Sequence, residues 1–279
     1  MISGAAKVAG VMGWPVAHSL SPRLHGYWLD VLGLDGAYVP FAVRPEDLGL
    51  ALKALPRLGV VGINLTVPHK ERALPLMARL DKAARTIGAV NTVTAAPDGL
   101  LTGRNTDAYG FLRHLEESAP SWRPGSGAAV VLGAGGAARA AIHALQEAGV
   151  ADIRMVNRTP ERAQKLLREF GLGYGVFSLE EVDRAFPEAA LLVNATSLGM
   201  TGAPPLELSL DGLPEGCIVY DLVYAPLETP LLAAARARGH KCVDGLGMLI
   251  HQAVPAFEAF FGVRPEVTAE VRRYLLERL

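Results

Sequence analysis

Short apolar runs rich in valine and isoleucine alternate with helical patterns along the whole of this 279-residue chain. Such alternation predicts α/β domains, in which parallel strands form a sheet and helices cover both of its faces. The expected strands are Val60–Val67, Ala128–Leu132, Ile153–Val156, Leu191–Ala195 and Ile218–Val223. The expected helices are Arg23–Leu32, Pro45–Leu55, Ala137–Ala148, Pro160–Phe170 and Thr229–Arg238, and the turn Pro97-Asp98-Gly99 predicts a hairpin.

The length allows two domains, because single domains usually hold about 100–200 residues. The segment Ala119–Gly127 is rich in Pro, Gly and Ser and interrupts both periodicities, so we expect it to be a linker. The last segment, Gly247–Leu279, carries two further helical patterns. We expect these helices to pack back on the N-terminal part of the chain.

Composition narrows the class of protein. Half of the residues are hydrophobic, 20% are charged and the formal net charge is −1, which gives no global attraction to nucleic acid or to an anionic membrane. No stretch approaches the roughly 20 apolar residues of a membrane span, and the N-terminus lacks the pattern of a secretory signal. Cys217 and Cys242 stand far apart, outside any metal-type pair, as free thiols do in a reducing compartment. We therefore expect a soluble, cytoplasmic protein with no metal.

A glycine-rich turn follows one of the expected strands. In Val130–Arg139, VVLGAGGAAR, Gly133 permits a tight turn and Gly135 allows the backbone to approach a pyrophosphate. The helix that follows offers free N–H groups and a positive dipole end to that anion. Ala138 takes the place of the third glycine and is small enough for close packing of helix against strand. A strand before the turn and a helix after it favour a dinucleotide site over a simple loop.

The end of the next strand indicates which dinucleotide binds. NAD-binding proteins usually place an acid there to bond the ribose 2′-hydroxyl. This chain has Asn157, Arg158 and Thr159 instead, and Arg162 follows one helical turn later. Arg158 can pair with a 2′-phosphate, whereas a merely solvated arginine at a helix start would oppose the helix dipole. The pattern favours NADP.

Polar residues in the N-terminal third mark a second site. Ser21 before Pro22 is a suitable helix cap, so its role is open, but Ser19 has no such task. Two hydroxyls at a helix N-terminus would hold a small carboxylate. Asn64 and Thr66 share one face of an expected strand, and Lys70, one of few lysines in the chain, stands where the strand ends. A lysine can exchange a proton in catalysis and an arginine cannot.

Two more polar segments follow, Asn91-Thr92 and Gly103–Asp107. On local grounds Asp107 could cap the helix after it or take part in chemistry. Taken in order, the motifs GWPVAHSLSP, GINLTVPHK, AVNT, GRNTDAYG, GAGGAAR, NRTPERA, NATSLGM, DLVYAPLETPLL and GLGMLIHQA resemble those of the shikimate dehydrogenases over nearly the whole chain. The resemblance implies that Lys70 and Asp107 are the catalytic pair.

The resemblance also implies a fold, a reaction and a set of ligand contacts. Residues 1–102 with 244–279 would form an α/β substrate-binding domain, and residues 103–243 a Rossmann-type NADP-binding domain. The reaction would be the reversible NADPH-dependent reduction of 3-dehydroshikimate to shikimate, a step towards aromatic amino acids. The implied substrate contacts are Ser19, Ser21, Asn64, Thr66, Lys70, Asn91, Asp107, Tyr224 and Gln252. The implied cofactor contacts are Gly133, Ala134, Gly135, Gly136, Ala137, Asn157, Arg158, Thr159, Arg162, Thr196, Ser197, Leu222, Gly245 and Met248.

Two positions depart from the pattern of these enzymes. Gly26 stands where Asn is common, and Trp14 stands where a smaller polar residue is common. Two alternatives stay open: a quinate or dual quinate/shikimate dehydrogenase using NAD, and a non-catalytic NADPH-responsive regulator on the same fold. The basic turn at Arg158 argues against the first, and the presence of Lys70 and Asp107 argues against the second. The expected partner is a small-molecule substrate, and a homodimer is compatible with the sequence.

Overall fold

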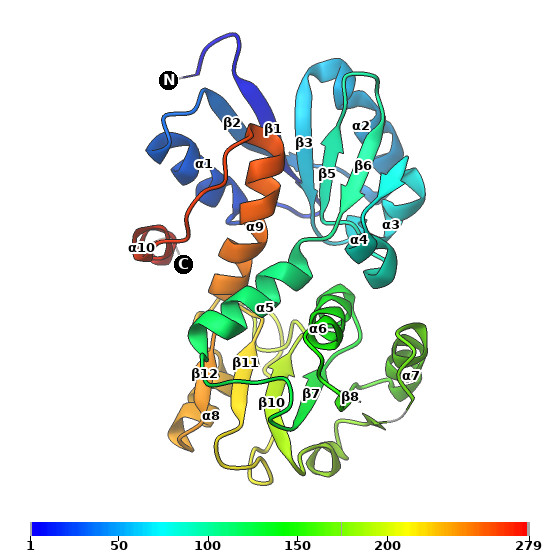
Figure 1. Cartoon of the computed structure of the whole chain (residues 1–279), viewed down its shortest axis with the longest axis vertical. Coiled ribbons are helices and arrows are strands. Elements are labelled where there is room, and N and C mark those ends of the chain that lie inside the picture. The colour runs from blue at the N-terminus through cyan, green and yellow to red at the C-terminus, as the bar shows by residue number, and fades with distance from the viewer. Residues whose placement is uncertain (1, 174, 278–279) are drawn as a thin grey trace. The chain divides into compact units, whose positions relative to one another are not determined.

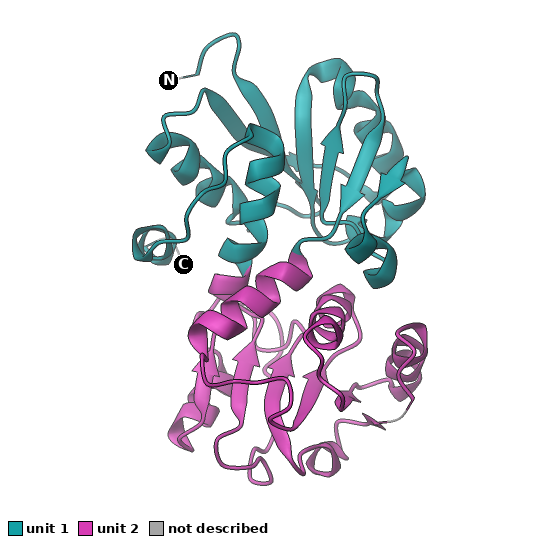
Figure 2. Ribbon diagram, viewed as in Figure 1, with its two compact units in different colours: residues 1–106, 249–278 teal, residues 107–248, 279 magenta. Residues whose placement is uncertain are grey.

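The computed structural model describes residues 2–173 and 175–277, which divide into two compact units (Figure 2). Unit 1 contains the described residues up to Thr106 and those from Leu249 onward, and unit 2 runs from Asp107 to Met248. In the described part of the chain, no helix combines the length and the apolar character needed to cross a membrane.

Unit 1 is built on a six-stranded sheet in the order β2-β1-β3-β5-β6-β4 (Figure 1). The strands are β1 (Lys7–Gly13), β2 (Gly36–Ala42), β3 (Val60–Leu65), β4 (Arg79–Leu80), β5 (Thr92–Ala95) and β6 (Leu101–Arg104). The first three pair in parallel, whereas β5 is antiparallel to β3 and to β6. The predicted hairpin is therefore confirmed, and it makes this sheet mixed rather than parallel.

The helices of unit 1 connect these strands. They are α1 (Ser21–Val31), α2 (Leu48–Ala54), α3 (His69–Arg72) and α4 (Lys82–Ile87), with short 3-10 turns at Pro45–Asp47, Pro56–Leu58 and Leu74–Leu76. Met12, Leu52, Ile63 and Val93 belong to one buried apolar cluster that joins the sheet to α2. Helix α2 therefore packs on one side of the sheet, and it lies within the predicted helix Pro45–Leu55.

The C-terminal helices return to unit 1, as predicted. They are α9 (Gly245–Phe261) and α10 (Ala269–Leu276). The Phe257 ring lies 5.5 Å from that of Trp28 on α1, and Tyr274 lies 5.0 Å from Tyr27. At Gly62 in β3, a Cβ atom would come within 2.3 Å of the Phe260 ring, so this strand position accepts only glycine while α9 packs there.

Unit 2 carries a second six-stranded sheet, in the order β12-β11-β10-β7-β8-β9, and all of its pairings are parallel. The strands are β7 (Ala128–Leu132), β8 (Ile153–Val156), β9 (Val176–Phe177), β10 (Ala189–Asn194), β11 (Ile218–Asp221) and β12 (Lys241–Val243). The helices are α5 (Asp107–Ser118), α6 (Gly136–Glu147), α7 (Pro160–Glu169) and α8 (Pro230–Ala237), with a 3-10 turn at Val182–Ala185. This strand order is that of the doubly wound dinucleotide-binding fold, with β7 at its centre.

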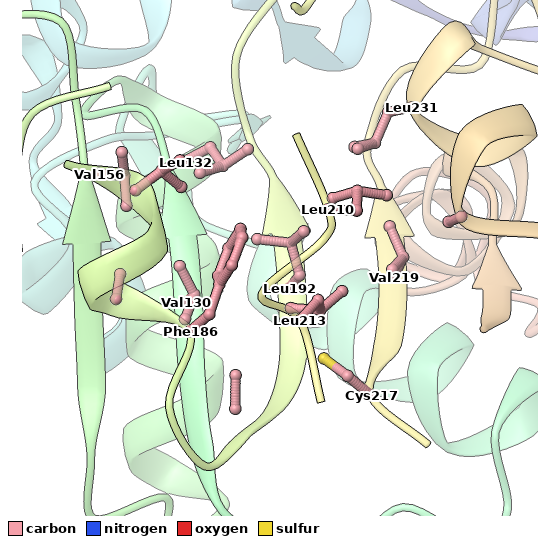
Figure 3. Packing of buried hydrophobic residues seen from close by; sticks show 14 of the residues in the cluster. Val130, Leu132, Val156, Phe186, Leu192, Leu210, Leu213, Cys217, Val219 and Leu231 are labelled. Carbon is pink, nitrogen blue, oxygen red and sulfur yellow. The ribbon is translucent and has the colours of Figure 1, made fainter. Parts of the chain in front are cut away.

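An apolar core lies against the second sheet. Phe186, Leu192, Leu213 and Val219 face one another in it together with Leu132 at the end of β7 (Figure 3). Burying one side chain of this size stabilises the folded protein by about 1.5–3 kcal/mol relative to leaving it exposed. The core therefore fixes β7, β10 and β11, whose carboxyl ends carry the predicted cofactor residues.

Three boundaries differ from those expected from the sequence. The chain returns to unit 1 at Leu249 and not at residue 244. Gly103 and Arg104 belong to unit 1, because they pair with β5 in its sheet, and the first unit ends at Thr106. The segment Ala119–Gly127 is not a linker between units, because it joins α5 to β7 inside unit 2. Its Pro and Gly residues lie between the end of α5 and the start of β7, so its composition resembles that of a linker.

Candidate active site

The glycine-rich turn lies at the carboxyl end of β7, next to β10 where the order of strands reverses. Gly133 has φ +105°, and a Cβ there would lie 3.0 Å from Thr196 Cγ2, so both backbone and packing require glycine. A Cβ at Gly135 or Gly136 would meet nothing within 4 Å, which leaves the backbone open at the start of α6. Ala138 is completely buried, as expected for close packing of α6 on the sheet. The turn therefore offers a cradle that fits a phosphate group.

The basic turn lies beside this cradle. Gly133 donates its N–H to the carbonyl of Val156 at 2.8 Å, which places the end of β8 next to the glycine turn. The amide of Asn157 donates to the carbonyl of Thr159 at 2.7 Å and shapes the turn into α7. Arg158 and Arg162 are both exposed. Their charged ends are therefore accessible to a phosphate at this edge of the sheet.

A buried polar cluster that the sequence did not single out organises the loops after β10 and β11. Asp221 accepts hydrogen bonds from Thr229 Oγ1 at 2.6 Å, from Asn194 Nδ2 at 2.9 Å and from the N–H of Val223 at 3.0 Å. Asn194 in turn accepts from Thr196 Oγ1 at 2.7 Å. Burial raises the pKa of Asp221, and these bonds act in the opposite direction.

The Asp221 cluster holds several predicted residues in the two loops. Thr196 is half-buried and Ser197 exposed in the first loop, while Leu222 and Tyr224 are half-buried in the second. Burial raises the pKa of Tyr224, so its hydroxyl stays protonated and can donate. The predicted Gly245 lies against the second loop, because a Cβ there would come within 2.2 Å of the Leu222 carbonyl oxygen.

In unit 1, the two serines lie at the start of α1, as the sequence predicts. Ser21 is the first residue of the helix, its predecessor Leu20 occupies the cap position, and no side chain caps the helix. Ser19 Oγ instead accepts the N–H of Ser21 at 3.3 Å. Of the two roles left open for Ser21, the structure excludes the helix cap, and Ser19 has a local structural role that the sequence did not indicate.

Asn64 lies in the interior of a hydrogen-bond network. Its Oδ1 accepts from the Tyr38 hydroxyl at 2.7 Å, and its Nδ2 donates to the carbonyl of Asn91 at 3.1 Å and to Thr92 Oγ1 at 3.0 Å. Asn64 is 6% exposed, and both hydrogens of its amide nitrogen are engaged within unit 1.

Asn91 connects this network to the returning helix α9. Asn91 Nδ2 donates to Thr106 Oγ1 at 2.9 Å and to Gln252 Oε1 at 3.3 Å. Its Oδ1 accepts from the N–H of Thr106 at 2.9 Å and from Thr92 Oγ1 at 3.0 Å. The structure thus brings Asn64, Asn91 and Gln252 together, although they come from three separate segments of the chain.

The predicted catalytic residues lie in different units. Lys70 lies in α3, half-buried, and its carbonyl accepts the N–H of Val90 at 2.8 Å, next to Asn91. Thr66 is also half-buried, and its N–H donates to the carbonyl of Met12 at 3.0 Å. Asp107 is the buried first residue of α5 in unit 2. The pairing of Lys70 with Asp107 stays a prediction.

Aromatic rings in unit 1 pack around His25, and one of them belongs to Tyr38 of the network. His25 is completely buried and stacks on Tyr38, with 3.9 Å between ring centroids. The rings of Trp28 and Phe257 also contact His25, at 5.9 and 5.7 Å. Burial lowers the pKa of His25 to about 3, so the ring is neutral at physiological pH. Tyr38, Thr92 and Thr106 were not assigned from the sequence, because only their partners, distant along the chain, give them a role.

Comparison with known proteins decides the family. The chain matches the family model of the shikimate dehydrogenase substrate binding domain over residues 11–93, shikimate / quinate 5-dehydrogenase over 123–200, and the shikimate 5′-dehydrogenase C-terminal domain over 245–273. It is 57% identical to the shikimate dehydrogenase (NADP(+)) of Rhodospirillum rubrum over 280 residues, which cover 99% of each chain. The chain belongs to the shikimate dehydrogenase family.

Solved structures of the family agree with the fold. A shikimate 5-dehydrogenase of Thermus thermophilus, in complex with NADP(H) and shikimate, matches with a TM-score of 0.87 and 41% identity, covering 98% of this chain and 100% of that one. A quinate dehydrogenase of Corynebacterium glutamicum in complex with NAD matches with a TM-score of 0.89 and 34% identity, covering 98% and 99%. The fold is thus common to enzymes that differ in cofactor and substrate.

The ranges of the three family models cover some of the predicted site residues and not others. The first covers Ser19, Asn64 and Lys70, and the last covers Gln252. Asp107 and Tyr224 lie outside all three ranges. For these two residues, the assignment rests on the resemblance of the motifs around them and on relatives that match over the full length of the chain.

Proposed function

We propose that this protein catalyses the reversible NADPH-dependent reduction of 3-dehydroshikimate to shikimate. The observation that carries the proposal is the gathering of Asn64, Asn91 and Gln252 into one hydrogen-bonded network in unit 1. A small polyhydroxy acid needs a carboxylate site and several directed hydrogen-bond partners. We assign the first to the two serines at the start of α1 and the second to this network. The names of relatives that match over the full length support the same substrate and cofactor.

The proposed cofactor site is the edge of the second sheet. The backbone of Gly133–Gly136 would hold the pyrophosphate, because the cradle is open and lies at the N-terminus of α6. Arg158, with Arg162 beside it, would bind the 2′-phosphate through charge-assisted hydrogen bonds. Ala134, Ala137, Asn157, Thr159, Thr196, Ser197, Leu222, Gly245 and Met248 complete the proposed set. When bound, NADPH supplies the hydride for the carbonyl carbon.

The protein's own contribution is position and proton transfer. Ser19 and Ser21, with Tyr224, would hold the substrate carboxylate, and Asn64, Thr66, Asn91 and Gln252 would orient the ring hydroxyls. Lys70 and Asp107 would flank the reacting oxygen, so that a proton reaches it as hydride reaches the carbon. One chain supplies all of these residues, so the proposed reaction needs no second copy. The cysteines form no disulfide, which suits the reducing cytoplasm.

A quinate dehydrogenase using NAD is the second candidate, favoured by the likeness to the Corynebacterium glutamicum enzyme. The turn Asn157-Arg158-Thr159 argues for NADP, because it offers a cation and no acid at the end of β8. Four assays separate the candidates: oxidation of shikimate and of quinate, each with NADP and with NAD. We expect kcat/KM to be highest for shikimate with NADP. A higher value for quinate with NAD would assign the second function instead, and inactivity in all four would refute both.

A further inference from the structure

The Asp221 cluster in unit 2 contains none of the side chains assigned to the proposed reaction. It consists of Asp221 at the end of β11, Asn194 at the end of β10 and Thr229, which caps α8. Asp221 and Asn194 are completely buried, and Thr229 is 1% exposed. Water therefore cannot easily replace a lost member, and each lost bond leaves a buried polar group without that partner.

Asp221 joins three separate segments of the chain. Its Oδ1 accepts from Asn194 Nδ2 at 2.9 Å and from the N–H of Val223 at 3.0 Å, and its Oδ2 accepts from Thr229 Oγ1 at 2.6 Å. The three donors belong to a strand end, a loop and a helix cap. Because both oxygens of a carboxylate can accept, one side chain serves all three segments at once.

The cluster continues where the backbone pairing of the sheet ends. Strands β10 and β11 pair up to Asn194 and Asp221, and the N–H of Leu222 donates to the carbonyl of Asn194 at 3.0 Å. Beyond this point the N–H groups of Thr196 and Val223 donate to side chains, to Asn194 Oδ1 at 3.1 Å and to Asp221 Oδ1 at 3.0 Å. The paths of the two loops thus depend on the side chains of the cluster.

Helix α8 anchors the cluster to the core of unit 2. Thr229 Oγ1 accepts the N–H of Leu232 at 3.3 Å as the helix cap, while its hydroxyl donates to Asp221. Leu231 and Leu232 belong to the buried apolar core of the second sheet. The position of Asp221 is therefore tied to a helix that cannot shift without disturbing that core.

The two loops carry proposed cofactor contacts. Thr196 Oγ1 donates to Asn194 Oδ1 at 2.7 Å, and a Cβ atom at Gly133 would lie 3.0 Å from Thr196 Cγ2. In the other loop, the carbonyl of Val223 accepts the N–H of Gly245 at 3.2 Å. The cluster therefore sets the positions of Thr196 and Gly245 in the proposed cofactor site.

The strand order indicates which half of the cofactor these loops meet. The proposed pyrophosphate site follows β7, and Arg158, after β8, is proposed to bind the 2′-phosphate of the adenosine half. Strands β10 and β11 lie on the other side of β7 (Figure 1). A dinucleotide bound across the carboxyl ends of the strands would therefore place its nicotinamide half over the loops after β10 and β11.

We propose that Asp221 is a positioning residue, which holds the loops after β10 and β11 in place for the nicotinamide half of NADP. The inference rests on the proposed function and deepens it. A loop that is already ordered loses less conformational freedom when the cofactor binds, so more of the interaction free energy appears as affinity. Arg158 would act on the 2′-phosphate, whereas Asp221 acts on the half that NADP and NAD share.

The test is the binding of NADP and of adenosine 2′,5′-bisphosphate, a fragment that lacks the nicotinamide half. Thr229→Val removes the 2.6 Å bond to Asp221 Oδ2. We expect this variant to bind NADP about tenfold more weakly, which corresponds to about 1.4 kcal/mol, and to bind the fragment within about twofold of the wild type. Thr229→Ser keeps the hydroxyl and should retain the wild-type affinity for NADP.

Two controls separate this effect from general damage. Thr268 caps α10 in unit 1 by accepting the N–H of Val271 at 3.4 Å, outside the Asp221 cluster. Thr268→Val therefore removes a cap of the same kind and should bind both ligands as the wild type does. Arg158→Leu is the opposite control, because it should weaken the binding of NADP and of the fragment alike.

Asp221→Asn is a second test, since it keeps the shape of the side chain but replaces one acceptor oxygen by a donor. It should weaken the binding of NADP and leave the fragment unaffected. Unchanged affinity for NADP in both Thr229→Val and Asp221→Asn would overturn the proposal, and so would equal losses for NADP and the fragment.

Binding is measured without substrate, which separates this inference from the proposed reaction. A wild-type protein that binds NADP but fails to oxidise shikimate would refute the reaction, and the same binding data would still decide the role of Asp221. Failure of the wild type to bind NADP would overturn both.

Discussion

Replacing His25 should reduce the amount by which the free energy of unfolding falls between pH 7 and pH 5. The His25 ring is completely buried among Trp28, Tyr38 and Phe257, and burial lowers its pKa from 6.5 to about 3. In the unfolded chain the same ring would titrate near pH 6.5. Between these two values the unfolded state binds one more proton than the folded state, so stability falls as the pH falls.

The size of the effect follows from the shift. Each pKa unit corresponds to about 1.4 kcal/mol, so lowering the pH from 7 to 5 should cost about 2 kcal/mol through His25. That is a large part of a typical total stability of about 5–15 kcal/mol. The stabilisation is fully present above pH 6.5 and is lost progressively towards pH 3. Burial also lowers the pKa of His69, which adds to the loss in the same direction.

The assay is urea unfolding of the wild type and of His25→Phe at pH 7 and pH 5. His25→Phe keeps an aromatic ring against Tyr38 and cannot bind a proton. We expect the variant to lose about 2 kcal/mol less than the wild type between the two pH values, because contributions from His69 and other groups cancel in the comparison. Equal losses in both proteins would refute the idea that buried His25 stays neutral.

Three further changes test the site and the fold. Lys70→Ala should lower kcat by about 10²–10⁴-fold with a smaller change in the KM for shikimate, and a kcat near wild type would remove Lys70 from the mechanism. Arg158→Leu should raise the KM for NADP by about 10- to 100-fold and leave the use of NAD unchanged; equal losses with both cofactors would assign Arg158 to the fold. Gly62→Ala should destabilise the protein by about 1–3 kcal/mol, because its Cβ would meet the Phe260 ring at 2.3 Å, and a wild-type melting temperature would contradict that packing.

The core strands of unit 2 were predicted well because their signals are local. The expected strands Ala128–Leu132 and Ile153–Val156 coincide with β7 and β8. The predicted runs near β10 and β11 continue past the ends of these strands, since Asn194 and Asp221 turn into polar loops there. Apolar periodicity detects a buried strand but carries no information on where a buried polar cluster ends it.

The candidate site was predicted in part. The glycine turn is marked by residue type alone, since only glycine adopts the φ of Gly133 without strain. Serine caps are ambiguous, because Ser19 and Ser21 are both small polar residues before a proline, and backbone geometry decides which one bonds an N–H. The sequence indicated no role for Tyr38, because tyrosine is an ordinary residue in a strand. Only the structure shows that its hydroxyl donates a hydrogen bond to Asn64 Oδ1.

The sequence by itself determined the alternation of helices and strands, the glycine cradle and the basic turn at Arg158, because each depends on residues close together in the chain. It also identified the family, through motifs spread over its whole length. Only the tertiary structure decided that β6 belongs to unit 1 and that Asp221 organises the loops after β10 and β11. It also decided that the Tyr38 hydroxyl donates a hydrogen bond to Asn64. These features depend on hydrogen bonds between segments that meet only after folding. The periodicity of a short segment carries no information on which distant hydrogen-bond acceptor a buried donor will meet. Packing of the core determines that pairing.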